Sequence, residues 1–495
     1  MAELAEPIPA RSGQPHLADR LRLFKERVRA WSGVRRFVLL LLVLYVVKQG
    51  IFVIAFHPFT GHDEVSHFAY VRTVAEEGRV PVLLEDRLPN DLYPYCNFTL
   101  DWYCQPTVAT FLRNPPTQAT GWDGRAHPSG LQYGANHPPL YAILMAPLYR
   151  LSDGQSAVVQ QYLLRVAAIP FGLATVFLAY RTARALFPGD AFLAVTVPTF
   201  VAFQPQISYE AAMVNNDIVA IALYSWILLL LVVGVRDRFP ARTCVLIGLA
   251  LGLALLAKGT SLTAAPVVGL AMIAGIGWRR VREWVGKGAL VAAIAGAIVA
   301  PWFVFLWRTY GNLSGLEQIA QIQWWNYYGV SKPSIADLLF NRGFAAMRFR
   351  ETWGEFGWRD IPLSTGLLWA IGAPLVVAIG GLIHYAATTR PGTPSPVADP
   401  VVHPARWQFV ALGVMAATVA IAYFAVVQFG TRFQLTQARY YFPAVNAAAL
   451  LLMLGLRSVT PRSAHAYGQG AVFASLVVLN VLIFTQYVIP HYRAT

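Results

Sequence analysis

Residues 37–67 read FVLLLLVLYVVKQGIFVIAFHPFTGHDEVSH, and this stretch decides the class of fold. Its first 20 residues contain one charged side chain, Lys48, which fits a helix that crosses the hydrocarbon core of a membrane. The next 11 residues hold one Asp, one Glu and three His. Ionisable side chains are therefore concentrated where the chain leaves a predicted membrane span.

The composition of the whole chain indicates an integral membrane protein. Hydrophobic residues make up 56% of the chain and charged residues 13%, and the mean hydropathy is +0.48, values outside the usual range for soluble globular proteins. The stretch Val245–Gly277, interrupted by AKGTS, predicts a hairpin of two short spans. With it, the expected fold is all-α and polytopic, with about eleven transmembrane helices. The other predicted spans are Phe37–Phe56, Leu163–Leu178, Phe192–Phe203, Ile218–Val235, Ala289–Leu306, Gly366–Tyr385, Phe409–Gln428, Phe442–Leu456 and Ala471–Val488.

The distribution of Lys and Arg predicts the orientation in an inner (cytoplasmic) membrane. Short loops rich in these residues stay cytoplasmic, and they alternate correctly with the spans if the N-terminus is cytoplasmic. Two long segments, His57–Gln160 and Arg308–Pro362, then lie outside and are expected to carry interfacial helices. The net charge of +14 is a topology signal with some attraction to anionic membrane lipids, and nucleic acid is not an expected partner. The expected parts are a basic cytoplasmic segment (1–36), a transmembrane core (37–308) with the outer loop 57–160, a second outer loop (309–362) and C-terminal transmembrane helices (363–495).

The first outer segment carries candidate functional residues on a short helix. Apolar residues recur at helical spacing from Gly61 to Glu77, which predicts an amphipathic helix at the outer interface. Asp63, His67 and Tyr70 share one face of that helix. A capping role for Asp63 or Glu64 is the alternative, because a carboxylate is stabilised in the first turn of a helix.

A divalent metal ion stays open as a cofactor. His62, Asp63, Glu64 and His67 have the chemistry of metal ligands. Neighbouring residues of a helix point in different directions, however, so spacing alone does not predict a site. No other cofactor is expected.

Four further features lie in the predicted outer regions. His137 precedes two prolines at the start of a helix too short to span, where it is either a ligand-binding residue or an ordinary loop residue. Glu210 and Asp217 bracket a turn between two spans, and acids beside a membrane are functional candidates. Cys96 and Cys104 lie eight residues apart, where a disulfide would act as a loop staple. The aromatic segments QWWNYYG and ETWGEFGW are either interfacial belt residues or a platform for stacking a sugar.

The motifs, taken in order, resemble a known superfamily. They are DE (63–64), HPPLY (137–141), NND (215–217), LAKGT (256–260), WGEFGW (353–358) and QARYYFP (437–443). Their order and membrane sidedness resemble the GT-C superfamily, the integral-membrane glycosyltransferases that use polyprenyl-phosphate sugars. Its protein mannosyltransferase and aminoarabinose transferase types are similar, as is a large bacterial family of membrane glycosyltransferases without an assigned substrate. The resemblance extends from Phe37 to about Leu456.

The resemblance implies a role for each matching residue. The first-loop acid of such enzymes deprotonates the acceptor, which attacks the anomeric carbon with inversion; Asp63 matches that position, and Glu64 is the next candidate. The cations that contact the donor phosphate correspond to His137 and Arg439, with Lys258 as a third. The remaining predicted substrate-binding residues are His67, Tyr70, Glu210, Asp217 and Tyr440.

One departure from the family pattern affects these roles. The family often has Glu and Lys before the Pro-Pro, and this chain has Asn136 and His137. The change weakens the case for a metal there and leaves the charge of His137 dependent on pH. Arg439 has its own alternative, which is to snorkel to the interface or to pair with an acid such as Glu351, Glu355 or Asp360.

Elementary chemistry asks for the same residue types. A hydroxyl is a poor nucleophile, and a positioned carboxylate base contributes roughly 10²–10⁴-fold. The leaving phosphate needs preorganised cations. The expected partners are a polyprenyl-phosphate sugar donor and a lipid, glycan or protein acceptor. Three alternatives remain. The first is a lipid-linked glycan transporter or flippase, for which AKGTS with Lys258 would be a discontinuous helix. The others are a glycan polymerase or ligase and a non-catalytic scaffold.

Overall fold

The structure is a computed structural model, and the described part is almost entirely helical. It describes residues 17–89, 91–92, 118–120, 126–128, 132–322, 331–357, 359–392, 401–433 and 436–494. Its strands form two short antiparallel pairs: β1 (Gln118–Thr120) with β2 (Ala126–Pro128), and β3 (Glu355–Phe356) with β4 (Ile361–Pro362). Cys96, Cys104 and the QWWNYYG segment (323–329) lie outside the described residues.

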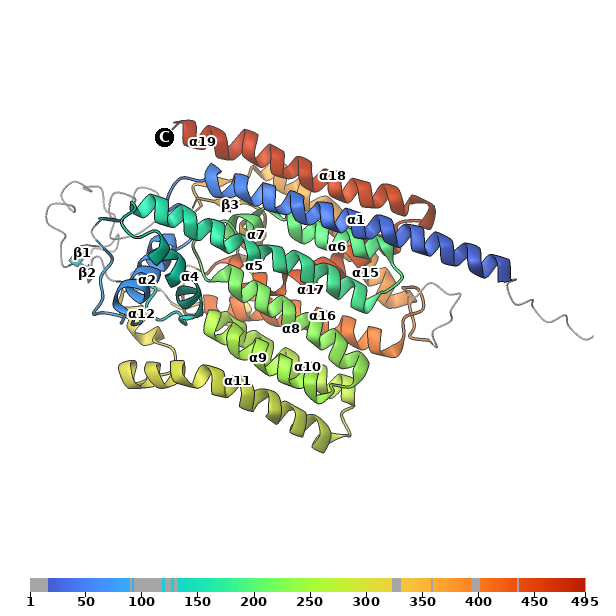
Figure 1. The fold of residues 1–495 in the computed structure, drawn as a ribbon, viewed down its shortest axis with the longest axis horizontal. Coiled ribbons are helices and arrows are strands. Elements are labelled where there is room, and N and C mark those ends of the chain that lie inside the picture. Colours follow the sequence, from blue (N-terminus) through green and yellow to red (C-terminus); the bar gives the residue numbers. More distant parts are fainter. Residues whose placement is uncertain are drawn as a thin grey trace, which may run out of the picture.

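The long helices lie side by side along one axis and form a bundle (Figure 1). Within the described residues, nine helical units are long and apolar enough to cross a membrane. The polytopic all-α class is therefore confirmed. The units are the Gly33–Ala55 part of α1 (Leu17–Ala55), α5 (Ala157–Leu186), α8 (Asp217–Asp237), η2 (Gly259–Thr263) with α10 (Ala264–Ile276), α11 (Val281–Tyr310), α15 (Thr365–Thr388), α16 (Arg406–Gly430), η3 (Ala438–Ala444) with α17 (Val445–Val459), and Arg462–Arg493, which comprises η4 (Arg462–Ala464), α18 (His465–Ile483), η5 (Phe484–Val488) and most of α19 (Ile489–Ala494).

Two shorter apolar helices correspond to the other two predicted spans. They are α6 (Ala191–Phe203) and α9 (Ala241–Ala257). Both lie within the bundle, and α9 packs between α8 and α11. Their lengths of 13 and 17 residues fall below the usual length of a span. The total of eleven crossings therefore stays a prediction.

The chain forms the predicted hairpin between α9 and α10. At Lys258 the helical dihedral angles end, with φ −159° and ψ 138°, and η2 follows. Arg238, just before α9, donates a 3.3 Å hydrogen bond to the carbonyl of Ile276 at the end of α10. The beginning of α9 and the end of α10 therefore lie together, and Lys258 lies at the opposite tip of the hairpin.

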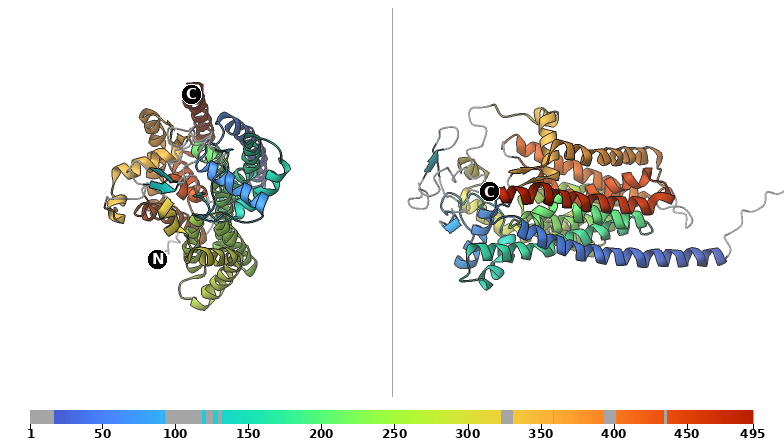
Figure 2. Two further views of the ribbon diagram at one scale, coloured as in Figure 1. Left: turned by 90° about the vertical axis from the view of Figure 1, so that its left-hand side faces the viewer. Right: turned by 90° about the horizontal axis from the view of Figure 1, so that it is seen from above.

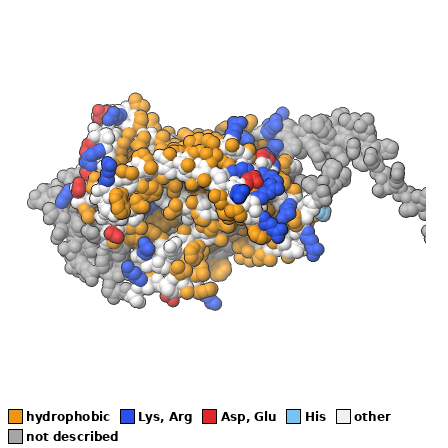
Figure 3. Space-filling model, turned by 90° about the horizontal axis from the view of Figure 1, so that it is seen from below, with side chains coloured by type: hydrophobic (Ala, Val, Ile, Leu, Met, Phe, Trp, Pro, Cys, Tyr) orange, Lys and Arg blue, Asp and Glu red, His pale blue; other side chains and the backbone are white. Residues whose placement is uncertain are grey.

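The surface matches a protein surrounded by lipid. Hydrophobic side chains cover the middle of the face shown in Figure 3, and Lys and Arg gather at its right-hand end, away from α2 (Glu64–Glu77) and α4 (Leu140–Leu151). Single apolar side chains such as Ile54 and Trp369 are largely exposed. In water such a surface would be a liability, whereas in a bilayer it faces hydrocarbon.

Short elements collect at the end of the bundle where α2 and α4 lie (Figures 1 and 2). α2 packs against α4, and most of its residues are buried. The predicted interfacial helix therefore begins at Glu64, and most of its residues are buried within this end of the bundle rather than on its surface. The other short elements of the fold are α7 (Pro205–Glu210), α12 (Leu316–Ile322), α13 (Ile335–Leu339) and α14 (Arg342–Trp353).

Helices α15 and α17 pack in close contact through small residues. A Cβ added to Gly381 would meet the carbonyl group of Gly455, and one added to Gly455 would meet the carbonyl of Ala378. Small residues allow such backbone approach between membrane helices. Because η3 continues directly into α17, this contact also helps to position the residues of η3.

Candidate functional site

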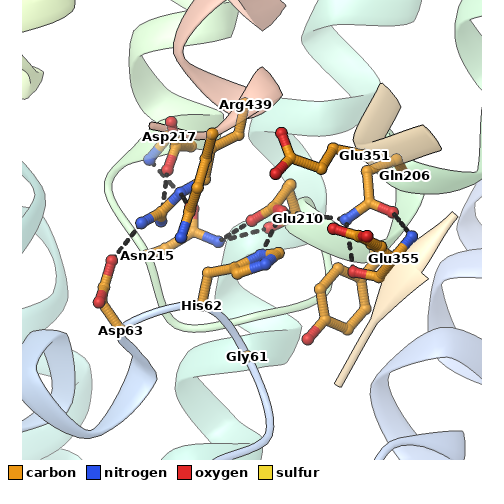
Figure 4. Close-up of polar contacts among 12 residues, drawn as sticks. Gly61, His62, Asp63, Gln206, Glu210, Asn215, Asp217, Glu351, Glu355 and Arg439 are labelled. Atoms are coloured by element: carbon orange, nitrogen blue, oxygen red, sulfur yellow. Dashed lines mark hydrogen bonds and ion pairs between the residues drawn. The ribbon is translucent and has the colours of Figure 1, made fainter. Parts of the chain in front are cut away.

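A chain of ion pairs joins four residues from four separate parts of the sequence. Arg439, in η3, contacts the carboxylate of Asp63 through Nη2 and Oδ2 of Asp217 through Nη1 at 3.2 Å. Nζ of Lys258 lies 2.6 Å from Oδ1 of the same Asp217. Figure 4 shows Arg439 between the two aspartates. We call these four residues the charged quartet; it holds two cations and two carboxylates.

Asp63 occupies an unusual backbone position. Its φ of 54° and ψ of 22° are left-handed, and its side chain does not cap α2. A non-glycine residue in this region costs free energy, and such residues cluster at functional sites. Burial raises the pKa of Asp63, but the Arg439 guanidinium, with smaller contributions from His62 and His137, outweighs burial and holds that pKa below its usual value. The capping alternative is therefore wrong for Asp63, which is an ionised partner of Arg439.

Glu64 points away from the quartet into a separate buried ion pair. Arg165 of α5 binds both of its carboxylate oxygens, at 2.8 and 2.7 Å, and neither side chain is exposed. The backbone N–H groups of Val214 and Gly61 also donate to Glu64. The pair fixes the start of α2 against α5. Removing one partner would leave a buried unpaired charge, at a cost of about 3–5 kcal/mol.

Two histidines stand beside the quartet. The ring centroids of His67 and His137 are 5.2 Å apart, and Nε2 of His67 is buried without a hydrogen-bond partner among the described residues. Tyr70 donates a 3.0 Å hydrogen bond to the carbonyl of His137. Burial, with Lys258 and Arg439 nearby, lowers the pKa of His137 to about 4. The expected pH-dependent charge of His137 is therefore displaced to acid pH, and the ring is neutral near pH 7.

Glu210 faces a second polar group next to Arg439. Its Oε1 lies 2.7 Å from Nδ1 of His62, and Asn215 donates to its Oε2 at 3.1 Å. A narrow cavity opens here, between these residues and the segment predicted as the second outer loop (Figure 4). It is lined by His62, Gln206, Glu210, Glu351, Glu355, Arg359, Gln437, Ala438 and Arg439. Such a polar lining suits a hydroxyl-rich ligand rather than an apolar one.

The acids of the segment predicted as the second outer loop have partners of their own. Glu351 pairs with Arg348 and Arg359, and Glu355 pairs with Arg350 at 2.8 Å. Arg439 is paired with neither of them, nor with Asp360. The alternative that Arg439 pairs with an acid therefore holds in kind, but its partners are Asp63 and Asp217 rather than Glu351, Glu355 or Asp360.

The described residues do not fit a divalent metal ion. They contain no group of three His, Cys, Asp or Glu side chains placed to hold one. The four candidate ligands diverge: Asp63 faces Arg439, Glu64 faces Arg165, His62 faces Glu210 and His67 faces His137. Both carboxylates among them, Asp63 and Glu64, already have an arginine partner.

Some residues of the site were not predicted from the sequence. Arg165 lay in a predicted span, and an Arg at that depth was itself a signal because an intramembrane charge requires a partner. Lys48 is a similar case: it is buried in α1 and donates to the carbonyl of Ala202 in α6 and to the hydroxyl of Ser208 in α7. Tyr440, a predicted site residue, lies with its ring 5.4 Å from Nζ of Lys258.

Comparisons with known proteins agree with this architecture. The family model of dolichyl-phosphate-mannose-protein mannosyltransferase matches residues 136–305. The structure is similar to that of ArnT from Cupriavidus metallidurans bound to undecaprenyl phosphate, with a TM-score of 0.50 and 15% identity over 92% of this chain and 73% of that chain. The chain therefore has the fold of the GT-C superfamily of integral-membrane glycosyltransferases, and the resemblance expected from the sequence is confirmed.

A second similar structure is the oligosaccharyltransferase AglB from Archaeoglobus fulgidus, in complex with an inhibitory peptide and a dolichol-phosphate. Its TM-score is 0.46, with 13% identity over 91% of this chain and 55% of that chain. This chain therefore spans about half the length of the archaeal protein. No curated protein sequence matches the chain.

Proposed function

We propose that the protein is an inverting glycosyltransferase that moves a sugar from a polyprenyl-phosphate donor to an acceptor hydroxyl on the extracytoplasmic face. One observation carries the proposal. The acid at the end of the first span, Asp63, lies in contact with Arg439, a cation 376 residues further along the chain. The reaction needs a base and a phosphate-binding cation in one site, on opposite sides of the anomeric carbon, and this contact brings both residue types to one site within a GT-C fold.

Asp63 acts as the general base. The acceptor oxygen forms a bond to the anomeric carbon while the bond from that carbon to the phosphate oxygen breaks. The proton of the acceptor hydroxyl passes to Asp63, and the electron pair of the broken bond leaves with the polyprenyl phosphate. Attack from the face opposite the phosphate inverts the anomeric configuration.

Arg439, Lys258 and His137 hold the phosphate. Arg439 and Lys258 meet at Asp217, so both cations are aimed at one small region. A fixed cation stabilises developing negative charge without reorganisation during the reaction. Neutral His137 contributes a ring N–H as a donor, and His67, whose Nε2 has no partner among the described residues, offers a second ring nitrogen.

The decisive experiment separates donor binding from turnover. The purified protein in lipid nanodiscs is given a panel of polyprenyl-phosphate sugars and a membrane extract as the acceptor source, and the released polyprenyl phosphate is measured. Wild type should turn over at least one donor. Asp63→Asn should still bind undecaprenyl phosphate, but its turnover rate should fall by a factor of about 10² or more.

The matched control is Asp91→Asn. Asp91 also pairs with an arginine, Arg72, here through two hydrogen bonds, but Asp91 is half exposed and lies outside the quartet. This variant should turn over like wild type. Near-normal turnover by Asp63→Asn would show that another group is the base.

A further inference from the structure

The cations that would hold the donor phosphate are already occupied. The three nitrogens of Arg439 contact Gln437, Asp217 and Asp63, and its side chain is 4% exposed. Lys258 is paired with Asp217 and is also buried. A phosphate group that enters this site therefore meets cations that are bound to carboxylates.

Charge balance shows why both carboxylates cannot stay in place. The quartet has two positive and two negative charges, and neither His67 nor His137 carries charge near neutral pH. A phosphodiester adds one negative charge to a buried region, where an unpaired charge is costly. Exchange of a carboxylate for the phosphate at one cation would give the phosphate a paired position.

The two aspartates differ in how firmly they are held. Asp217 contacts both cations, its backbone N–H donates to Asn215 at 3.0 Å, and its side chain is 1% exposed. Asp63 is 17% exposed, and among the described residues its carboxylate pairs with Arg439 alone. Asp63 has fewer contacts to lose.

The following inference rests on the proposed function. We propose that the donor phosphate displaces Asp63 from Arg439, while Asp217 stays bound to Arg439 and Lys258 and keeps both cations directed at one anion-binding position. Asp217 is then a positioning residue. Asp63 is a built-in competitor of the donor until the donor has bound, and only afterwards is its carboxylate free for the acceptor.

The exchange also prepares Asp63 as a base. In the structure Arg439 holds the pKa of Asp63 low, against the effect of burial. Once Arg439 turns to the phosphate, burial remains and raises that pKa toward the pH at which a base is most effective. The donor must therefore bind before the acceptor is deprotonated.

The test is a double-mutant cycle on the affinity for undecaprenyl phosphate, measured on the full chain in nanodiscs. The four proteins are wild type, Asp63→Asn, Arg439→Gln and the double variant. Removing the competing charge should tighten binding by Asp63→Asn at least about 10-fold, since hydrogen bonds to charged groups are the strong ones. In the Arg439→Gln background the same substitution should give no gain, because no exchange is left to make.

The outcomes are distinct. Unchanged or weaker binding by Asp63→Asn overturns the inference, and so does an equal gain in both backgrounds, which would reflect general electrostatics. Asp91→Asn, as the charge-matched control, should bind like wild type. If wild type does not bind the lipid phosphate at all, the proposed function itself fails. A thermal-unfolding measurement on each variant confirms that the compared proteins are folded.

Discussion

His67 and His137 stand side by side as neutral rings next to two buried cations. Burial is the largest cause of their lowered pKa values, and Lys258 and Arg439 act in the same direction. In the unfolded chain both rings titrate near 6.5. The unfolded state therefore binds more protons than the folded state at mildly acid pH.

A pH-dependent stability follows. The contribution of the two neutral rings to the free energy of unfolding is fully present above about pH 6.5. It is lost as the pH falls from there toward 4, because lowering the pH favours the state that binds more protons, which is the unfolded state. We expect the melting temperature in detergent to drop between pH 7 and 5. His137→Gln, which cannot titrate, should flatten the curve, whereas equal slopes for wild type and variant would contradict the assignment.

The sequence supplied the acids and cations of the site but not their pairing. Asp63 and Arg439 were predicted from motifs, because a charge at the end of a span is rare and visible. The pairs Asp63–Arg439 and Lys258–Asp217 depend on how α8, the α9–α10 hairpin and η3 meet, and no local pattern encodes that contact. The direction of the Glu64 side chain could not be predicted from the sequence either. Only the position of Arg165 in the fold shows that Glu64 points away from the site that Asp63 enters.

Among the elements, α15 and α17 approach each other closely at Gly381 and Gly455. Gly380 and Gly381 are adjacent on α15, yet a Cβ at Gly381 would meet the Gly455 carbonyl while a Cβ at Gly380 would meet nothing within 4 Å. The two glycines are a matched pair of test positions.

We expect Gly381→Ala to destabilise the protein by about 1–3 kcal/mol, the usual cost of overpacking. Gly380→Ala should be close to neutral. Thermal unfolding of the two variants in the same detergent checks this. A similar loss for both would mean that helix propensity or lipid contact, rather than the α15–α17 approach, governs this stretch.

Helical periodicity predicted most elements correctly and some boundaries less well. The hairpin at AKGTS and the apolar spans follow from length and hydropathy, which act locally. α2 begins at Glu64 rather than near Gly61, because the residues before it turn to place Asp63 against Arg439. Its burial was not predictable either, since the helices that cover it are distant in sequence.

The whole molecule has two chemically different ends. α1 begins at the end of the bundle opposite to the one where the chain finishes in α19 (Figures 1 and 2). The charged quartet lies toward the end where α19 finishes, and the face in Figure 3 shows Lys and Arg gathered at the other. By the positive-inside rule, we expect the N-terminus in the cytoplasm and the quartet outside.

Cysteine labelling tests this orientation. In a background with Cys96, Cys104 and Cys244 replaced, a membrane-impermeant maleimide added to intact cells should label Thr495→Cys and leave Gly13→Cys unlabelled. Inverted membrane vesicles should give the reverse pattern. Labelling of both positions from the same side would break the expected odd number of crossings.

The left-handed backbone at Asp63 also restricts which residues can replace it without destabilising the protein. Asn and Gly adopt this conformation readily, whereas β-branched residues are strained in it. In a saturation library, Asn and Gly should be expressed at wild-type abundance without activity, and Val, Ile and Thr should in addition reduce abundance. Selection that scores abundance and selection that scores activity would therefore rank the same substitutions differently, which separates the cost of the backbone from the loss of the carboxylate.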